Sequence, residues 1–362
     1  MVSAKQIAIK NEPTPGYPFQ FDKHSDDATF TTVEKNIDEN DLSDGEVLVE
    51  THYLSNDPAQ KFWIASIDKN YAKGVSKGEV IPARGIAKVL ASKNSKFSVG
   101  DFVSARTGWT SHCILKDSDG VELTKLDLTK VSDPSWYLSV LGGTALTAYF
   151  IFYRYAELQE RESDYGKTFL ISGAAGAVGS VCIQIALHRF KAAKVIAIAG
   201  GAEKVKFVES FGSRVVGVDY KDPSFKDNLL KAAGGQNTVD YFIDNVGGEI
   251  LDFSTALLKV HAYIIACGSI SGYNDPSKLP FKNYVSVVTK RLTIKGLLLY
   301  DNKENFPAGY SKLLEMIESN QLDVSKAETM VDATGEKFDD IPLIWNSLFE
   351  GRNKGKLITK LK

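Results

Sequence analysis

The chain has 362 residues, of which 43% are hydrophobic, and its formal net charge is −2. This length allows two domains, each with its own core. The near-neutral charge argues against a general nucleic-acid binder or a membrane-surface protein, because both usually carry a basic excess. The three cysteines lie far apart and the five histidines are scattered, so we expect neither a disulfide framework nor a metal site.

Neither the start of the chain nor its apolar stretches have the pattern of a targeting or membrane-spanning segment. Met1–Gly16 has no continuous apolar region of the kind found in secretory signals. The most apolar stretch, Leu138–Tyr153, is interrupted by Gly142 and Gly143 and is shorter than a membrane span. We therefore expect a cytoplasmic protein with no nucleic-acid or membrane partner.

The chain up to about residue 140 is rich in predicted strands. In Val47–Tyr53 one set of residues, Val47, Val49 and Thr51, alternates with another, Leu48, Glu50 and His52, as the two faces of a strand do. The other predicted strands are Lys5–Lys10, Phe30–Val33, Ile86–Ala91 and Asp101–Ala105. No helix of ordinary length is expected before about residue 135, so the pattern indicates a β-rich, barrel-like domain.

Predicted helices and strands then alternate. The helices are Trp136–Tyr155, Val178–Arg189, Glu203–Phe211, Phe225–Ala233 and Ile250–Val260. The strands are Thr168–Ser172, Lys194–Ala199, Val215–Val218, Asp240–Ile243, Ala262–Cys267 and Leu292–Leu299. This alternation is typical of a parallel, doubly wound α/β sheet. The tail adds helices Ala308–Ser319 and Ile341–Glu350 and strands Glu328–Asp332 and Gly355–Thr359, and its short β content suggests a return to the first domain.

A glycine-rich turn joins the strand at Thr168–Ser172 to the next helix. It has the sequence Gly173-Ala-Ala-Gly-Ala-Val-Gly179, with Ala174 in place of the first glycine of the Gly-x-Gly-x-x-Gly pattern. Unpaired N–H groups and the helix dipole at such a helix start bind a pyrophosphate, and the glycines allow close backbone approach. A tight turn without a ligand is the alternative. The candidate cofactor-binding residues of this loop are Gly173, Ala174, Gly176, Ala177, Val178 and Gly179.

The end of the second strand of the alternating region indicates which dinucleotide binds. In NAD-binding folds an acidic residue at this position bonds the ribose 2′-hydroxyl, but here the strand ends Ala199-Gly200-Gly201. Lys204 follows in the next helix and offers an ammonium to a 2′-phosphate, although Glu203 beside it counts against this. NADPH is therefore favoured over NADH; the alternative for Lys204 is a solvated surface lysine.

Several motifs together resemble the zinc-independent medium-chain dehydrogenase/reductases, and within them the prostaglandin reductase and alkenal double-bond reductase branch. The motifs are Ser92–Asp101, Thr107–Thr110, Gly142–Tyr149, Ala174–Gly179, Asp244–Gly248, Cys267–Asn274 and Asn353–Lys356. The resemblance covers nearly the whole chain. It implies a GroES-like, barrel-like catalytic domain, 1–140 with 308–362, into which an NADPH-binding Rossmann domain, 141–307, is inserted.

The resemblance also implies roles for single residues. Lys204 and Tyr220 match positions on the 2′-phosphate and adenosine side of NADPH. The other implied cofactor contacts are Gly200, Asn245, Gly268, Tyr273, Thr147 and Asn353. Tyr300 matches the tyrosine nearest to proton transfer, with Tyr273 as the second catalytic candidate. For both, a tyrosine at the edge of the core is the alternative.

Members of this branch reduce the C=C bond of α,β-unsaturated aldehydes and ketones. Hydride reaches the β-carbon, the carbonyl oxygen gains charge as an enolate, and the α-carbon takes a proton from a tyrosine, the cofactor ribose or water. This chemistry needs no metal. The resemblance also implies a homodimer, because members of the family are often dimeric.

Two positions depart from the family pattern. Where the family usually has Asp-Pro-Tyr-Met-Arg, this chain has Asp57-Pro-Ala-Gln-Lys61, so Ala59 replaces a substrate-pocket tyrosine. Gly201 stands where a serine often follows the second strand. Two other hypotheses therefore stay open: an NADPH quinone oxidoreductase and a non-catalytic NADPH-binding sensor. We interpret Asp57 as a structural carboxylate.

Overall fold

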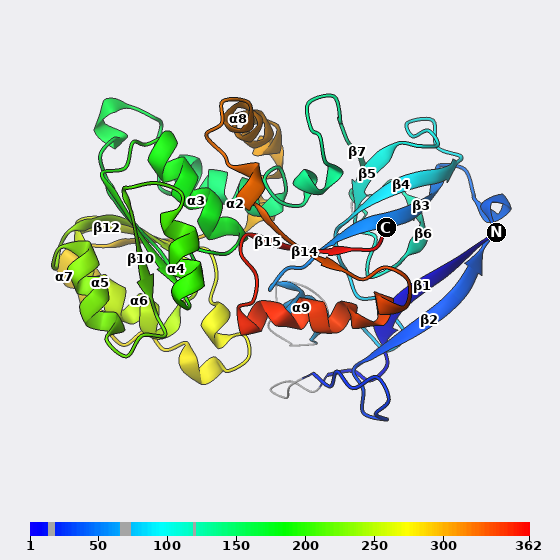
Figure 1. The fold of residues 1–362 in the computed structure, drawn as a ribbon, viewed down its shortest axis with the longest axis horizontal. Helices are drawn as coiled ribbons and strands as arrows, with labels where there is room; N and C mark the ends of the chain where they lie inside the picture. Colours follow the sequence, from blue (N-terminus) through cyan, green and yellow to red (C-terminus); the bar gives the residue numbers. More distant parts are fainter. Residues whose placement is uncertain (14–18, 66–73, 119–120) are drawn as a thin grey trace. The chain divides into compact units, whose positions relative to one another are not determined.

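The computed structural model describes residues 1–13, 19–65, 74–118 and 121–362. It divides into two units (Figure 1). The first unit comprises Met1–Leu138, Thr329–Arg352 and Lys356–Lys362, and the second comprises Ser139–Glu328 and Asn353–Gly355.

The expected domain boundaries are 1–140 with 308–362, and 141–307. The second unit also contains residues 139–140, 353–355 and, as the main difference, 308–328. The physical reason is helix packing. Helix α8 (Phe306–Glu318) lies so close to α2 (Gly143–Phe150) that a Cβ at Gly309 would lie 2.6 Å from Cδ2 of Leu146.

Antiparallel strands form most of the first unit. One pair consists of β1 (Val2–Ile9) and β2 (Phe30–Ile37). A seven-stranded sheet has the order β14 (Glu328–Asp332), β15 (Lys356–Lys360), β3 (Glu46–Ser55), β4 (Gly85–Ser92), β5 (Phe102–Ala105), β7 (Thr124–Lys125), and β6 (His112–Lys116) pairs with β3. Its α-helices are α1 (Gln60–Ile64) and α9 (Ile341–Glu350). Val47 and Val49 of β3 are completely buried, and Leu48 on the opposite face is buried as well. The predicted alternation is therefore confirmed only over Val49–His52.

The second unit is a doubly wound α/β layer structure. Its parallel sheet has the order β10 (Val215–Asp219), β9 (Lys194–Ala199), β8 (Thr168–Ile171), β11 (Val239–Asp244), β12 (Leu258–Ala266), β13 (Thr293–Gly296). Its other α-helices are α3 (Ala177–His188), α4 (Ala202–Glu209), α5 (Phe225–Ala233), α6 (Gly248–Ser254) and α7 (Val285–Lys290). Numbered from β8, the strand order is 3-2-1-4-5-6, which is the Rossmann order. The predicted fold class is therefore confirmed.

Three predicted elements of this unit are shorter than expected. The helix predicted over Trp136–Tyr155 is broken: the 3₁₀ turn η2 (Pro134–Tyr137) comes first, Gly142 is extended, and α2 passes into a π-helical turn, η3 (Ile151–Tyr155). The helix predicted to reach Val260 ends earlier because β12 begins at Leu258. The strand predicted over Leu292–Leu299 is limited to β13, whose four residues pair with the last four of β12.

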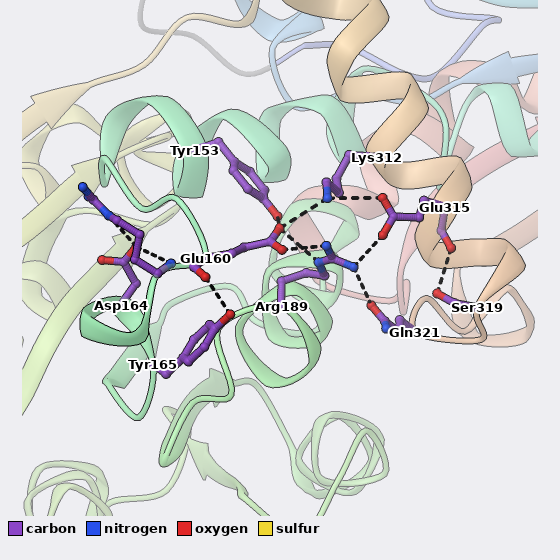
Figure 2. A network of polar contacts seen from close by, with 10 residues as sticks. Tyr153, Glu160, Asp164, Tyr165, Arg189, Lys312, Glu315, Ser319 and Gln321 are labelled. Carbon is purple, nitrogen blue, oxygen red and sulfur yellow. Dashed lines mark hydrogen bonds and ion pairs between the residues drawn. The ribbon is translucent and has the colours of Figure 1, made fainter.

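A charged network fixes the segment that follows η3 (Figure 2). Arg189, which ends α3, donates to both carboxylate oxygens of Glu160, from Nε at 3.1 Å and from Nη2 at 2.6 Å. Its Nη1 donates to Glu315 of α8 at 2.8 Å. The hydroxyl of Tyr153 donates to Glu160, and Nζ of Lys312 lies 3.5 Å from the same carboxylate. The network therefore connects η3, α3 and α8 within the second unit.

Candidate functional site

Two glycines of the turn at the end of β8 occupy positions that disfavour or exclude a side chain. Gly173 has a φ of +59°, in the left-handed region that favours glycine. A Cβ on Gly179 would lie 2.5 Å from the carbonyl oxygen of Gly173 and 2.6 Å from Cα of Ala174. No side chain fits there, so the first turn of α3 packs directly on the loop. Helix α3 starts after Gly176, which leaves its first N–H groups at the turn.

A buried carboxylate supports this turn from the end of β11. Asp244 is 2% exposed and accepts hydrogen bonds from Ser172 Oγ (2.7 Å) and from the backbone N–H groups of Val246 (3.0 Å) and Gly247 (3.0 Å). Burial raises the pKa of Asp244, and these hydrogen bonds oppose the increase. Asn245 donates from Nδ2 to the carbonyl of Ser172 at 2.7 Å. The end of β11 is thereby joined to the end of β8.

Two other predicted cofactor residues lie beside Asn245. A Cβ on Gly268 would lie 3.0 Å from the carbonyl oxygen of Asn245 and 3.6 Å from the hydroxyl of Tyr273. Tyr273 ends the 3₁₀ turn η6 (Ile270–Gly272). Gly173, Asn245, Gly268 and Tyr273 thus follow one another at the carboxyl ends of β8, β11 and β12, where doubly wound folds bind ligands.

The segment Asn353–Gly355 also reaches this edge. Gly355 forms a β-bridge with Gly176 and donates its N–H to the carbonyl of Ala175 at 2.8 Å. The side chain of Asn353 is buried and donates from Nδ2 to the carbonyl of Gly355 at 2.7 Å. The predicted contact Asn353 is therefore held next to the glycine turn by the backbone of its own segment.

A second group of predicted residues gathers at the end of β9. A Cβ on Gly200 would lie 2.6 Å from the ring of Tyr220, so the ring covers this glycine. Gly201 has a φ of +91°, and its N–H donates to Asp219 Oδ1 at 2.7 Å. The same oxygen accepts the N–H of Lys221 at 2.9 Å. The acid at the end of β10 is thus bonded to two backbone N–H groups of this turn.

Lys204 lies half-buried in the first turn of α4. Burial lowers the pKa of its ammonium, and the positive charges of Lys221 and Lys354 lower this pKa further. Two lysines from other parts of the second unit therefore lie near Lys204. The side chain of Lys204 is still partly exposed, so its role in binding the cofactor stays a prediction beside the alternative of a solvated surface lysine.

Thr147 and Tyr300 lie on two other elements. The hydroxyl of Thr147 donates to the carbonyl of Gly143 at 2.8 Å, inside α2. Tyr300 belongs to the 3₁₀ segment η8 (Leu299–Asn305) and is 39% exposed, with Nζ of Lys303 5.3 Å from its ring centroid. These two elements meet, since a Cβ on Gly143 would lie 3.0 Å from Leu299.

All the predicted site residues belong to the second unit, but sequence reasoning missed several neighbours that complete their surroundings. The missed residues are Ser172, Asp219, Lys221, Asp244, Lys354 and Gly355. Asp219, Asp244 and Lys354 are each adjacent in sequence to a predicted site residue, and this adjacency is the signal that could have identified them. Nothing local in the sequence indicated that Lys354 lies near Lys204, because only the folded backbone brings the two together.

The described part of the chain has neither a group of metal-binding side chains nor a membrane-spanning helix. No three or more His, Cys, Asp or Glu side chains are grouped there so that they could hold a metal ion. No helix there has the length and apolar content needed to cross a membrane. Zinc independence, the cytoplasmic location and the homodimer stay predictions.

Comparison with known proteins places these features in context. Residues 19–125 match the family model described as the N-terminal domain of oxidoreductase, and residues 177–319 match the one described as zinc-binding dehydrogenase. Prostaglandin reductase 1 of Bos taurus is 32% identical, over 99% of this chain and 100% of the relative. The 2-alkenal reductase (NADP(+)-dependent) of Nicotiana tabacum is 30% identical, over 99% and 97%.

Two further proteins are similar to this chain, one in its sequence and one in its structure. A Saccharomyces cerevisiae protein called "Uncharacterized membrane protein YML131W" is 63% identical over 100% of this chain and 99% of its own length. The crystal structure of CurA from Vibrio vulnificus in complex with NADPH superposes with a TM-score of 0.84 at 27% identity, over 99% of both chains.

Proposed function

The chain belongs to the medium-chain dehydrogenase/reductase family, in its prostaglandin reductase and alkenal reductase branch, and we propose that it reduces the C=C bond of α,β-unsaturated aldehydes and ketones with NADPH. The observation that carries the proposal is the dinucleotide edge of the second unit. There a glycine turn, in which Gly179 leaves no room for a side chain, lies beside the end of β9. That strand ends without an acid of its own, and Lys204 follows it in α4. The relatives named for 2-alkenal and prostaglandin reduction support the reaction class.

The residues present fit NADPH at two places. The loop Gly173–Gly179 and the exposed N–H groups at the start of α3 suit the pyrophosphate. Gly200, Tyr220 and Lys204 suit the adenosine 2′-phosphate, since the lysine supplies charge and the ring a flat surface. As the family resemblance implies, we assign Thr147 to the nicotinamide side of the cofactor. We assign Asn245, Gly268, Tyr273 and Asn353 to further contacts with it.

The protein's own residues have two tasks in this reaction. When bound, NADPH supplies the hydride that reaches the β-carbon of the substrate. The chain must then donate a hydrogen bond to the carbonyl oxygen as its negative charge grows, and a proton must reach the α-carbon. We assign the proton to the hydroxyl of Tyr300, with Tyr273 as the second candidate.

The substrate preference is the finer part of the proposal. Ala59 lies at the start of α1 in the first unit, where the family pattern has a pocket tyrosine. Part of the neighbouring loop, residues 66–73, lies outside the described residues. The smaller side chain of Ala59 leaves more space for the substrate than a tyrosine would, and it is also the feature that keeps the sensor hypothesis open.

The decisive experiment measures oxidation of NADPH by the purified chain with a medium-chain 2-alkenal, and in parallel with a quinone and with NADH. Turnover of the enal that prefers NADPH supports the proposal. Turnover of quinone alone overturns it in favour of a quinone oxidoreductase. NADPH binding without turnover of any substrate overturns it in favour of a sensor.

The role of Tyr300 is tested by Tyr300→Phe. We expect kcat for the enal to fall about a hundredfold, the size of effect typical of general acid catalysis, while the Kd for NADPH stays the same. Tyr310→Phe is the matched control, because Tyr310 is similarly exposed in the same unit. An unchanged kcat in Tyr300→Phe, with Tyr273→Phe impaired, would transfer the role to Tyr273.

A further inference from the structure

The short segment Asn353–Gly355 brings a lysine to the dinucleotide edge from the far end of the chain. The β-bridge between Gly355 and Gly176 and the hydrogen bond from Gly355 to Ala175 fix its backbone. Nζ of Lys354 then lies 3.9 Å from a carboxylate oxygen of Glu203 and 5.9 Å from the ring centroid of Phe207. Both neighbours are residues of α4, the helix that also carries Lys204.

Positive charge is concentrated at this helix start. Lys204 is half-buried, and the ammonium groups of Lys221 and Lys354 are close enough to act on it. Two carboxylates face the group. Glu203 contacts both Lys354 and Lys206, while Asp219 is bonded to two backbone N–H groups. A bound anion would relieve the repulsion that Lys221 and Lys354 exert on the half-buried Lys204.

We infer that Lys354 is a specificity-determining residue for the 2′-phosphate of NADPH, acting with Lys204 and Lys221, and that Glu203 weakens this binding by pairing with Lys354. The inference rests on the proposed use of NADPH and extends it to Lys354, a residue of the Asn353–Lys356 motif to which the family resemblance gave no role. A phosphate monoester carries close to two negative charges at neutral pH and is held best by several cationic donors. Lys204 alone would leave part of that charge unpaired.

The structural alternative gives Lys354 a different role. If its ammonium only anchors the C-terminal segment to α4 through Glu203, its loss would loosen the glycine turn as well. Binding of the pyrophosphate would then suffer whether or not a 2′-phosphate is present. The two roles are separated by comparing ligands that differ in this phosphate alone.

The experiment measures Kd by calorimetry for NADPH and NADH, and for the fragments 2′,5′-ADP and 5′-AMP, without any turnover. In Lys354→Met we expect the Kd for NADPH and for 2′,5′-ADP to rise about tenfold, which corresponds to about 1.4 kcal/mol. The Kd for NADH and for 5′-AMP should stay the same. In Glu203→Gln the Kd for NADPH should fall, by about twofold to threefold, because Lys354 loses its competing partner.

Lys206→Met is the matched control. Lys206 belongs to the same helix, contacts the same Glu203 at 3.5 Å and is highly exposed. We expect its loss to change the Kd for NADPH less than twofold. An equal loss of affinity for NADPH and NADH in Lys354→Met, or an effect no larger than that of Lys206→Met, would overturn the inference. Failure of the unaltered chain to bind either dinucleotide would instead overturn the proposed function, and the inference with it.

Discussion

The ion pair between Asp57 and Lys356 is the most deeply buried one in the described part of the first unit. Lys356 is 2% exposed, and its ammonium donates to Asp57 Oδ1 at 2.6 Å and to the carbonyl of Asn56 at 2.9 Å. Ser55 Oγ donates to the other oxygen of Asp57 at 2.5 Å. Burial alone would raise the pKa of Asp57, but the ammonium and the hydroxyl hold it below its ordinary value. The interpretation of Asp57 as a structural carboxylate is confirmed.

Lys356→Met should therefore leave a buried charge without compensation. We expect the free energy of unfolding of the first unit to fall by about 3–5 kcal/mol. The double variant Asp57→Asn with Lys356→Met should lose less, because no charge is left buried. Urea denaturation at neutral pH measures both. A single variant as stable as the double variant would contradict this account.

The contribution of Asp57 to the free energy of unfolding should decrease as the pH falls. A carboxyl whose folded pKa is lowered stabilises the protein above its unfolded pKa, and this contribution is lost as the pH falls through the folded pKa. The ordinary value for Asp57 is 3.8. The stability advantage of the unaltered chain over the double variant should be complete near neutral pH and shrink as the pH falls below 3.8. Denaturation curves at neutral and acidic pH check this, and an advantage that does not change with pH would contradict it.

At the scale of elements, the contact between α2 and α8 depends on one glycine. A Cβ on Gly309 would lie 2.6 Å from Leu146 Cδ2 and 3.2 Å from Tyr149 Cδ1. Gly309→Ala improves helix propensity by about 1 kcal/mol, but overpacking costs about 1–3 kcal/mol. We expect a net loss of stability in the second unit. Ser311→Ala, an exposed position of the same helix, should slightly stabilise it. A Gly309→Ala variant more stable than the original chain would show that the helices can separate without cost.

The sequence predicted the elements whose pattern of apolar and polar residues lies within the element itself. It did not predict where an element ends when that end depends on a neighbouring strand or on backbone geometry. The strand pattern of β3 and the apolar run of β9 are local, and both strands were found where they were expected. The apolar pattern around Gly142 continues through a break that only backbone geometry reveals. The strand predicted over Leu292–Leu299 is shorter because β12 offers no partner beyond Ala266.

The candidate site likewise contains residues that a sequence motif predicted and a residue that only the fold brings there. The glycine turn is contiguous in sequence, so its motif predicted Gly173–Gly179, and the structure brings these residues together with Asn245 and Gly268. Lys354 joins Lys204 only because Gly355 pairs with Gly176, a contact that the sequence pattern does not indicate. The roles of all these residues in binding NADPH stay predictions until affinities are measured.

At the scale of the whole molecule, the two units can be observed separately. All four tryptophans, Trp63, Trp109, Trp136 and Trp345, belong to the first unit. Tryptophan fluorescence therefore follows unfolding of the first unit alone, whereas far-ultraviolet circular dichroism follows both. Each unit has its own buried clusters, so we expect two transitions in urea rather than one.

Arg189→Met tests this expectation. The change leaves the half-buried carboxylate of Glu160 without its bidentate partner, which should destabilise the second unit by up to about 3–5 kcal/mol. The transition seen by circular dichroism alone should move to lower urea, while the fluorescence transition stays in place. NADPH should move that same transition back to higher urea, by about 2.7 kcal/mol at a hundred times its Kd. If fluorescence and circular dichroism shift together in Arg189→Met, the two units unfold as one cooperative molecule, and stabilisation by NADPH should then also reach the tryptophans.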